Sequence, residues 1–268
     1  MAGSTITRRT ALGFLGATMT MPLALRPAAA QAAWWRAIPG AAALVGDAAP
    51  ATDGIRIDLP LVSEDGSAVD LGLTVDRPMT QDSFVAELHV FADRNPSPEV
   101  AAFFFSPLSG RAAIATRIRL NESQTVGVVA RMNTGEVIVG SRDVVVTVSG
   151  CLARVGGTAP GLMETRVRAP TRFVAGAPGE VTTLINHPME TGLRTTLAGE
   201  ILPENIVRRF LAAFDRATVF EARFHRSVAT NPYLRFFVAP PRPGELALRW
   251  EADGGLVADA RVDLAVGA

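Results

Sequence analysis

The covalent chemistry open to this sequence centres on one thiol. Cys151 is the only cysteine among 268 residues, so the chain forms no internal disulfide and no multi-cysteine metal site. It lies in the run Val148-Ser149-Gly150-Cys151-Leu152-Ala153, where an expected strand ends. Because a glycine-flanked strand exit provides few side chains to cover a thiol, we expect Cys151 to be accessible and to react as its thiolate. The alternative is a cysteine that packs as a small hydrophobic residue.

The three histidines do not complete a familiar site with this cysteine. A blue-copper site needs a histidine within a few residues after the cysteine, and the next one is His187. His89 is expected within a strand and His225 at the end of another. A hydrolase needs a nucleophile, a histidine and an acid that converge, yet there is no nucleophile elbow, zinc motif or phosphate-binding glycine loop. We therefore expect no metal, no cofactor and no catalytic activity.

The elements that must position the thiol are expected to be β-strands. From Gly54 onward, apolar and polar residues alternate over short runs that are separated by turn residues. The pattern favours an all-β protein with two immunoglobulin-like β-sandwich domains in tandem, after a short helical segment at 34–48 that Pro39-Gly40 interrupts. The run Phe103-Phe104-Phe105 is expected in the core or in a contact between the domains. The expected strands are 55–59, 71–75, 85–91, 113–120, 126–132 and 144–148, then 165–168, 179–185, 219–225, 234–238, 246–250 and 261–266, with 203–210 compatible with either a helical turn or a strand.

The first residues have the layout of an export signal. Residues 1–30 contain no acidic residue, and Arg8-Arg9 precede a mildly apolar stretch that ends at Ala28-Ala29-Ala30. Paired arginines before such a stretch are typical of a twin-arginine signal. The apolar stretch is shorter than the roughly 20 residues that a membrane span needs. We expect a signal peptide at 1–32 and a periplasmic protein without a membrane span, with an uncleaved anchor as the alternative.

Composition excludes two other classes of protein. The 26 Lys+Arg balance the 26 Asp+Glu and the pI is near 6.9, which argues against a nucleic-acid-binding protein. A hydrophobic content of 48% with 19% charged residues excludes a wholly disordered chain. The expected organisation is a first domain at 33–151, a glycine- and proline-containing linker at 152–163 and a second domain at 164–268.

Short motifs along nearly the whole mature chain are those of one known family. They are Gly46-Asp47-Ala48-Ala49-Pro50, Ile55-Arg56-Ile57-Asp58-Leu59-Pro60, Glu64-Asp65-Gly66, Pro78-Met79-Thr80, His89-Val90-Phe91-Ala92-Asp93, Asn95-Pro96-Ser97-Pro98-Glu99-Val100, Thr116-Arg117-Ile118-Arg119-Leu120, His187-Pro188-Met189-Glu190-Thr191-Gly192, Pro203-Glu204-Asn205-Ile206, Phe220-Glu221-Ala222 and Asn231-Pro232-Tyr233. With them, the chain resembles the SoxYZ sulfur carrier, with a Y-like part up to Cys151 and a Z-like part from about Arg166 fused in one polypeptide.

The resemblance implies a carrier and not a catalyst. In that family a cysteine of the Y subunit holds thiosulfate-derived sulfur covalently, and the matching position here is Cys151. The implied partners are periplasmic sulfur-oxidation enzymes, namely a c-type cytochrome, a sulfate-releasing hydrolase and a sulfane dehydrogenase. The Z-like part is expected to pack on the Y-like part, and fusion raises the effective concentration of this intramolecular pairing.

The segment around the cysteine departs from the family pattern. The family has Gly-Gly-Cys-Gly-Gly at a free C-terminus, whereas Ser149, Leu152 and Ala153 replace three of these glycines and the chain continues. A loop held at both ends reaches less far, and Leu152 adds bulk beside the sulfur. Two alternatives therefore stay open: a SoxYZ-like accessory carrier associated with a quinoprotein (pyrroloquinoline-quinone) dehydrogenase, and a secreted β-sandwich binding module with an incidental thiol.

Overall fold

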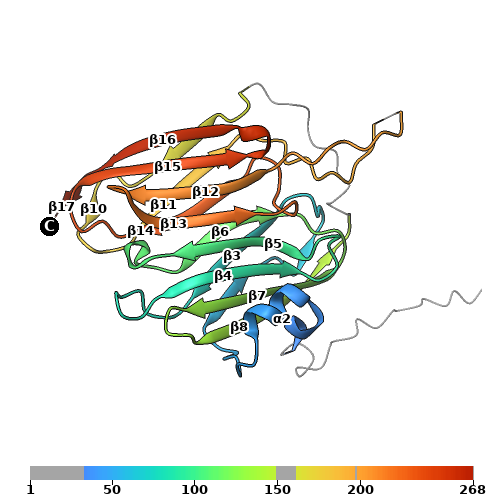
Figure 1. Ribbon diagram of the computed structural model, residues 1–268, viewed down its shortest axis with the longest axis horizontal. Helices are drawn as coiled ribbons and strands as arrows, with labels where there is room; N and C mark the ends of the chain where they lie inside the picture. The colour runs from blue at the N-terminus through green and yellow to red at the C-terminus, as the bar shows by residue number, and fades with distance from the viewer. Residues whose placement is uncertain (1–32, 149–160, 197, 268) are drawn as a thin grey trace, which may run out of the picture.

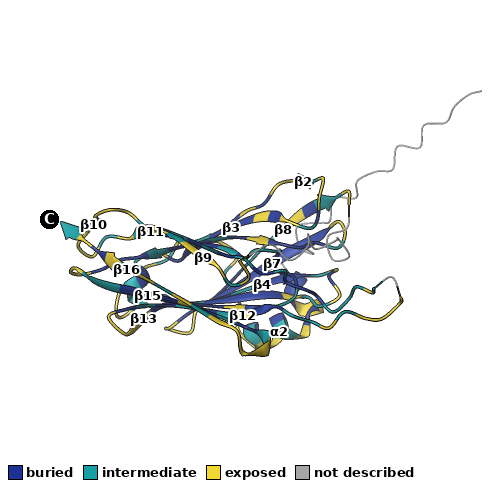
Figure 2. Ribbon diagram, turned by 90° about the horizontal axis from the view of Figure 1, so that it is seen from above, coloured by how far each residue is buried: buried dark blue, intermediate teal, exposed yellow. Residues whose placement is uncertain are grey.

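The computed structural model describes residues 33–148, 161–196 and 198–267, in which two large β-sheets pack face to face (Figure 2) and two short strands near the C-terminus form a third sheet. The first residues form a 3₁₀-helix and a short α-helix, and every later long element is a strand. The elements are η1 (Trp34–Ala37), α2 (Pro39–Val45), β1 (Ile55–Asp58), β2 (Val62–Ser63), β3 (Val69–Val75), β4 (Val85–Ala92), β5 (Glu99–Phe105), η2 (Pro107–Ser109), β6 (Ala113–Ile118), β7 (Gln124–Met132), β8 (Val137–Val146), β9 (Thr165–Arg168), β10 (Phe173–Val174), β11 (Gly179–Ile185), β12 (Val207–Phe214), β13 (Ala217–Phe224), β14 (Tyr233–Val238), β15 (Gly244–Ala252), η3 (Asp253–Gly255), β16 (Val257–Leu264) and β17 (Val266–Gly267).

Both sheets run continuously from the first half of the chain into the second (Figure 1). One sheet has the order β1-β3-β6-β14-β11-β9 and the other β16-β15-β12-β13-β5-β4-β7-β8-β2. The junctions are antiparallel: β5 pairs with β13 from Phe105↔Phe220 to Ala101↔Phe224, and β6 meets β14 at Ala115↔Arg235. The all-β class is confirmed, and the two halves are joined edge to edge in both layers.

The junction is filled by aromatic side chains. Phe103 and Phe105 point to the core from alternate positions of β5, as the pleat requires, and both contact Phe220 of β13 at ring-centroid distances of 6.1 and 5.4 Å. Phe220 also stacks on Phe236 of β14 at 5.0 Å. The expectation that the phenylalanine run supplies a contact between the halves is confirmed. The intervening Phe104 lies on the outer face, where Arg223 covers its ring at 4.5 Å.

The expected strands all overlap observed ones, but the sequence pattern missed others. β5 was not expected, because five of its seven residues are buried and a strand buried on both faces shows no alternation. The undecided stretch 203–210 leads into strand β12. Pro39, expected to interrupt a helix, occupies the first turn of α2, where proline is tolerated because that N–H has no helical partner.

The N-terminal helices cover part of the nine-stranded sheet from outside (Figure 1). Trp34 packs over Gly127 of β7, where an added Cβ would lie 2.3 Å from the indole, and beside Phe91 of β4 at 6.0 Å. Trp34 and Phe91, together with Trp35 and Ile38, belong to a small second hydrophobic core. Among the described residues, no helix is long and apolar enough to cross a membrane.

Candidate functional site

Cys151, the candidate reactive residue, lies outside the described residues, as do the expected signal peptide at 1–32 and most of the expected linker. The structure does describe the two points between which this segment runs, Val148 before it and Gly161 after it. These two anchors limit where Cys151 can be, because covalent geometry fixes the longest span of the intervening residues.

The anchor before Cys151 is held by backbone hydrogen bonds to β2. Val145 and Val146 of β8 pair in parallel with Val62 and Ser63. Beyond β8, the Thr147 N–H donates to the Ser63 carbonyl at 3.1 Å, and the Gly66 N–H donates to the Val148 carbonyl at 2.8 Å. The chain is therefore fixed up to the third residue before Cys151. Three residues span at most about 11 Å, so the Cys151 Cα lies within that distance of the Val148 Cα.

The anchor after Cys151 is a tight turn that leads into β9. The Glu164 N–H donates to the Gly161 carbonyl at 2.8 Å, and the Met163 N–H donates to the carbonyl of Asn186, which follows β11, at 2.9 Å. Gly161 is ten residues from Cys151, a span of up to about 36 Å. The position of the thiol is thus restricted by Val148 and hardly at all by Gly161.

A buried arginine joins the two halves at this end of the sandwich. Arg119 is 2% exposed, and its Nη2 donates to the Met189 carbonyl and to Thr230 Oγ1, both at 2.9 Å. Its backbone N–H donates to the Ser227 carbonyl, and the next residue, Leu120, donates to the carbonyl of Gly66 beside the first anchor. A buried guanidinium is stable only where its protons find acceptors. Arg119 therefore fixes the first anchor relative to the second half of the chain.

The histidines have structural surroundings. On β4, His89 Nε2 contacts Glu87 Oε2 at 2.8 Å. His187 is buried, and its Nδ1 accepts the Met189 N–H at 3.1 Å. Burial lowers the pKa of His187 and of His225. A hydrogen bond with Asn205 raises the pKa of His187, and the charge of Glu99 raises that of His225, but both effects are weaker than that of burial. Within the described ranges, no three His, Cys, Asp or Glu side chains are grouped to hold a metal ion.

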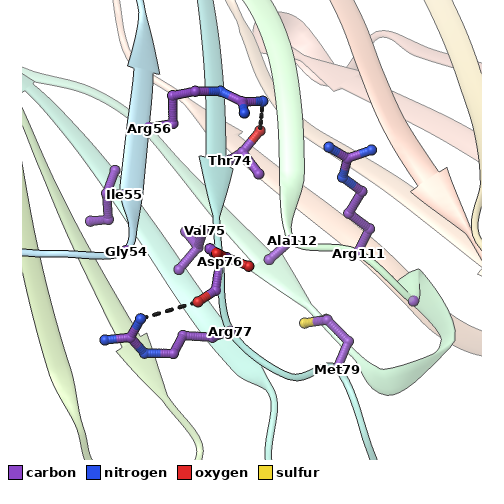
Figure 3. A pocket seen from close by; sticks show the side chains of 11 residues that line it. Gly54, Ile55, Arg56, Thr74, Val75, Asp76, Arg77, Met79, Arg111 and Ala112 are labelled. Carbon is purple, nitrogen blue, oxygen red and sulfur yellow. Dashed lines mark hydrogen bonds between the residues drawn. The ribbon is translucent and has the colours of Figure 1, made fainter.

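A cleft of about 480 Å³ lies on the six-stranded sheet, where β1 begins and β3 ends (Figure 3). No signal in the sequence singled out its arginines. Arg56 donates to Thr74 Oγ1 at 3.2 Å and to Asp58, and Arg77 pairs with Glu136 at 2.9 Å. These two guanidinium groups already have oxygen partners within the protein, and the third arginine of the cleft, Arg111, lies over the ring of Phe237 at 5.0 Å.

This cleft is also remote from the cysteine segment. It lies at the Val75 end of β3, whereas the other end, Val69, is close to Gly66, which is bonded to Val148. The six residue steps of β3 correspond to about 20 Å. The cleft therefore takes no part in chemistry at Cys151.

The fold and the anchored segment define a class of protein: two joined immunoglobulin-like β-sandwich halves with the only cysteine between them. Residues 41–151 match the family model described as sulfur oxidation protein SoxY, and residues 167–263 match that described as sulphur oxidation protein SoxZ. The chain therefore belongs to the sulfur-oxidation carrier family, as a fused SoxYZ protein. The SoxY match ends on Cys151.

Solved structures that resemble parts of the chain include the sulfur carrier protein SoxY from Chlorobium limicola f thiosulfatophilum, with 25% identity over 41% of this chain and 94% of that chain and a TM-score of 0.34. Two superoxide reductases are also similar. A neelaredoxin from Ignicoccus hospitalis has 14% identity over 41% and 90% of the two chains (TM-score 0.33), and the putative enzyme from Thermotoga maritima has 21% over 34% and 84% (TM-score 0.30). A comparison with curated proteins gives no match.

Proposed function

We propose that this protein is a periplasmic, non-catalytic carrier that holds sulfur compounds covalently on the thiol of Cys151. The observation that supports it most directly is the SoxY match, which ends on this single cysteine and is followed by a SoxZ half in the same chain. The twin-arginine-type signal in 1–32 supports export. The SoxZ half supplies strands β9–β17 and no thiol of its own.

In the carrier chemistry, sulfur compounds are attached covalently to the thiolate of Cys151. In loading, the Cys151 thiolate and the outer sulfur of thiosulfate form an S–S bond, and the two electrons released pass to a c-type cytochrome. In hydrolysis, water attacks the terminal sulfonate sulfur, which leaves as sulfate with two protons, and a persulfide anion remains on Cys151. A sulfane dehydrogenase then oxidises the remaining sulfane sulfur to a sulfonate with the oxygen atoms of three water molecules, which releases six protons, and the six electrons pass to a c-type cytochrome. A second hydrolysis releases this group as sulfate with two protons and returns the thiolate. Because the intermediate is bound covalently, it passes between these partners without diffusing away.

One observation favours a second candidate within the carrier class. The chain continues past Cys151 towards the second anchor at Gly161, and Leu152 stands beside the sulfur-bearing residue in the sequence, so a bulkier segment must enter a deep active site than in the case of a free tail. A SoxYZ-like accessory carrier for a quinoprotein dehydrogenase fits this restricted geometry. It predicts neighbouring genes for such an enzyme and none for sulfur oxidation.

The decisive experiment is the intact mass of the protein purified from periplasm, before and after reductant, beside the Cys151→Ser variant. The carrier function predicts a reductant-labile sulfur adduct that maps to Cys151 and is missing from the variant, whose circular dichroism is unchanged. A clean mass, with Cys151 alkylated readily but never loaded, would contradict sulfur carriage and favour the quinoprotein-associated protein. A thiol that reacts only after unfolding would favour the binding module.

A further inference from the structure

Three large apolar side chains are exposed at the base of the cysteine segment. Leu61 and Val62, at β2, are 69% and 52% exposed, and Val148 is 60% exposed. We call these three residues the anchor patch. β2 is the edge of the nine-stranded sheet, in the described part of the chain, and is drawn near the end of β8 in Figure 2. Sheet edges are commonly protected by charged side chains, so apolar residues here indicate a surface that another molecule covers.

Covalent geometry brings any enzyme that reacts with the thiol close to Val148, one of the three residues of the patch. Such an enzyme must approach Val148 to within the reach of Cys151, about 11 Å. A standard interface covers about 800 Å² per partner, a disc with a radius of about 16 Å. Val62 is paired with Val145, which puts it about 11 Å from Val148, with Leu61 one residue step further. The three residues are therefore close enough together for one interface that covers Val148 to cover them all.

Charges around the patch indicate what kind of partner fits. Glu64 and Asp65 directly follow β2 and are exposed, and Glu122 lies beside Ser123, whose Oγ accepts the Val146 N–H at 3.0 Å. Arg94 pairs with Glu122 at 3.5 Å. The rim is thus acidic by two charges. Two copies of such a surface would repel each other, whereas a partner with a basic rim would be attracted.

We propose, on the basis of the carrier function above, that the anchor patch is the docking surface for the enzyme that loads Cys151, and that this enzyme presents an apolar centre surrounded by lysine and arginine. The patch determines how tightly the enzyme binds, and the thiol performs the chemistry. Docking at this surface explains why Leu61 and Val62 are exposed next to the anchor that leads to Cys151.

The test compares Leu61→Asp with Val174→Asp in the full chain. Val174 is similarly exposed, at 61%, and lies on β10 at the opposite end of the sandwich (Figure 2). Purified thiosulfate-loading c-type cytochrome from the same organism supplies the enzyme, and intact mass follows loading at several carrier concentrations. The Leu61→Asp variant should raise KM at least about tenfold, the effect of about 1.4 kcal/mol, without changing kcat. The Val174→Asp variant should change neither.

Two further measurements make the result specific. The reaction of Cys151 with Ellman's reagent, a small disulfide, should proceed at the same rate in all variants, because a small probe needs no docking surface. Glu64→Lys should slow loading at low salt, and the difference should shrink as salt screens the charges.

Each outcome bears on the proposal. Loading of Leu61→Asp at the rate of the unsubstituted chain would overturn the docking inference and leave the carrier function standing. No loading of the unsubstituted chain would overturn the carrier function and the docking surface with it. Dimerisation that Leu61→Asp abolishes, with loading unaffected, would assign the patch to a second copy of the chain and overturn the proposal.

Discussion

Replacement of Phe220 by alanine should destabilise both halves of the protein together. Phe220 is fully buried and contacts two rings of the SoxY half, Phe103 and Phe105, and Phe236 of the SoxZ half at 5.0 to 6.1 Å. A buried Phe→Ala substitution costs about 3–5 kcal/mol, and the surrounding rings place this one toward the upper end. With a urea m-value of about 3 kcal/mol per molar, the midpoint should fall by about 1–2 M.

Pulse hydrogen exchange along a urea titration, read by mass spectrometry, measures the two halves separately in the same sample. Peptides from β7 report the SoxY half and peptides from β15 the SoxZ half. Because both sheets cross the junction, we expect the two sets to lose protection at one midpoint, and Phe220→Ala to lower both equally. Val174→Ala, at an exposed position, should change the free energy of unfolding by no more than about 0.5 kcal/mol, so it should shift neither midpoint by more than about 0.2 M. Molecules with β15 exchanged and β7 still protected would refute the idea that the halves unfold as one unit.

Two further substitutions probe the buried polar groups. Arg119→Met removes the donors to the Met189 carbonyl and Thr230 and should cost about 3 kcal/mol in urea unfolding; a loss below about 1 kcal/mol would show that these contacts are dispensable. Burial lowers the pKa of His187 and His225, so the unfolded chain binds protons first, and stability should fall as pH drops below about 6.5 by up to about 1.4 kcal/mol per unit for each histidine. His187→Asn keeps an acceptor for the Met189 N–H and should reduce that slope; an unchanged slope would contradict a neutral His187.

Much of the local structure was predictable from sequence because it depends on neighbouring residues. Alternation in stretches such as 71–75 and 234–238 marks strands with one buried face, and both are observed. β5 escaped prediction because a strand in the middle of a sheet is apolar on both faces. The two-residue strand β2 was missed because it is too short for any pattern to show.

The sequence alone determined the all-β class, the SoxY and SoxZ motifs and the identity of the only thiol, because composition, alternation and spacing are properties of the chain. The tertiary structure decided what these parts do together: that β5 pairs with β13, that Arg119 donates to Met189, and that Leu61 and Val62 lie beside the strand that leads to Val148. Residues 70 or more positions apart are joined in the first two cases. Such pairing follows from how the sheets pack as a whole, and no local pattern encodes it.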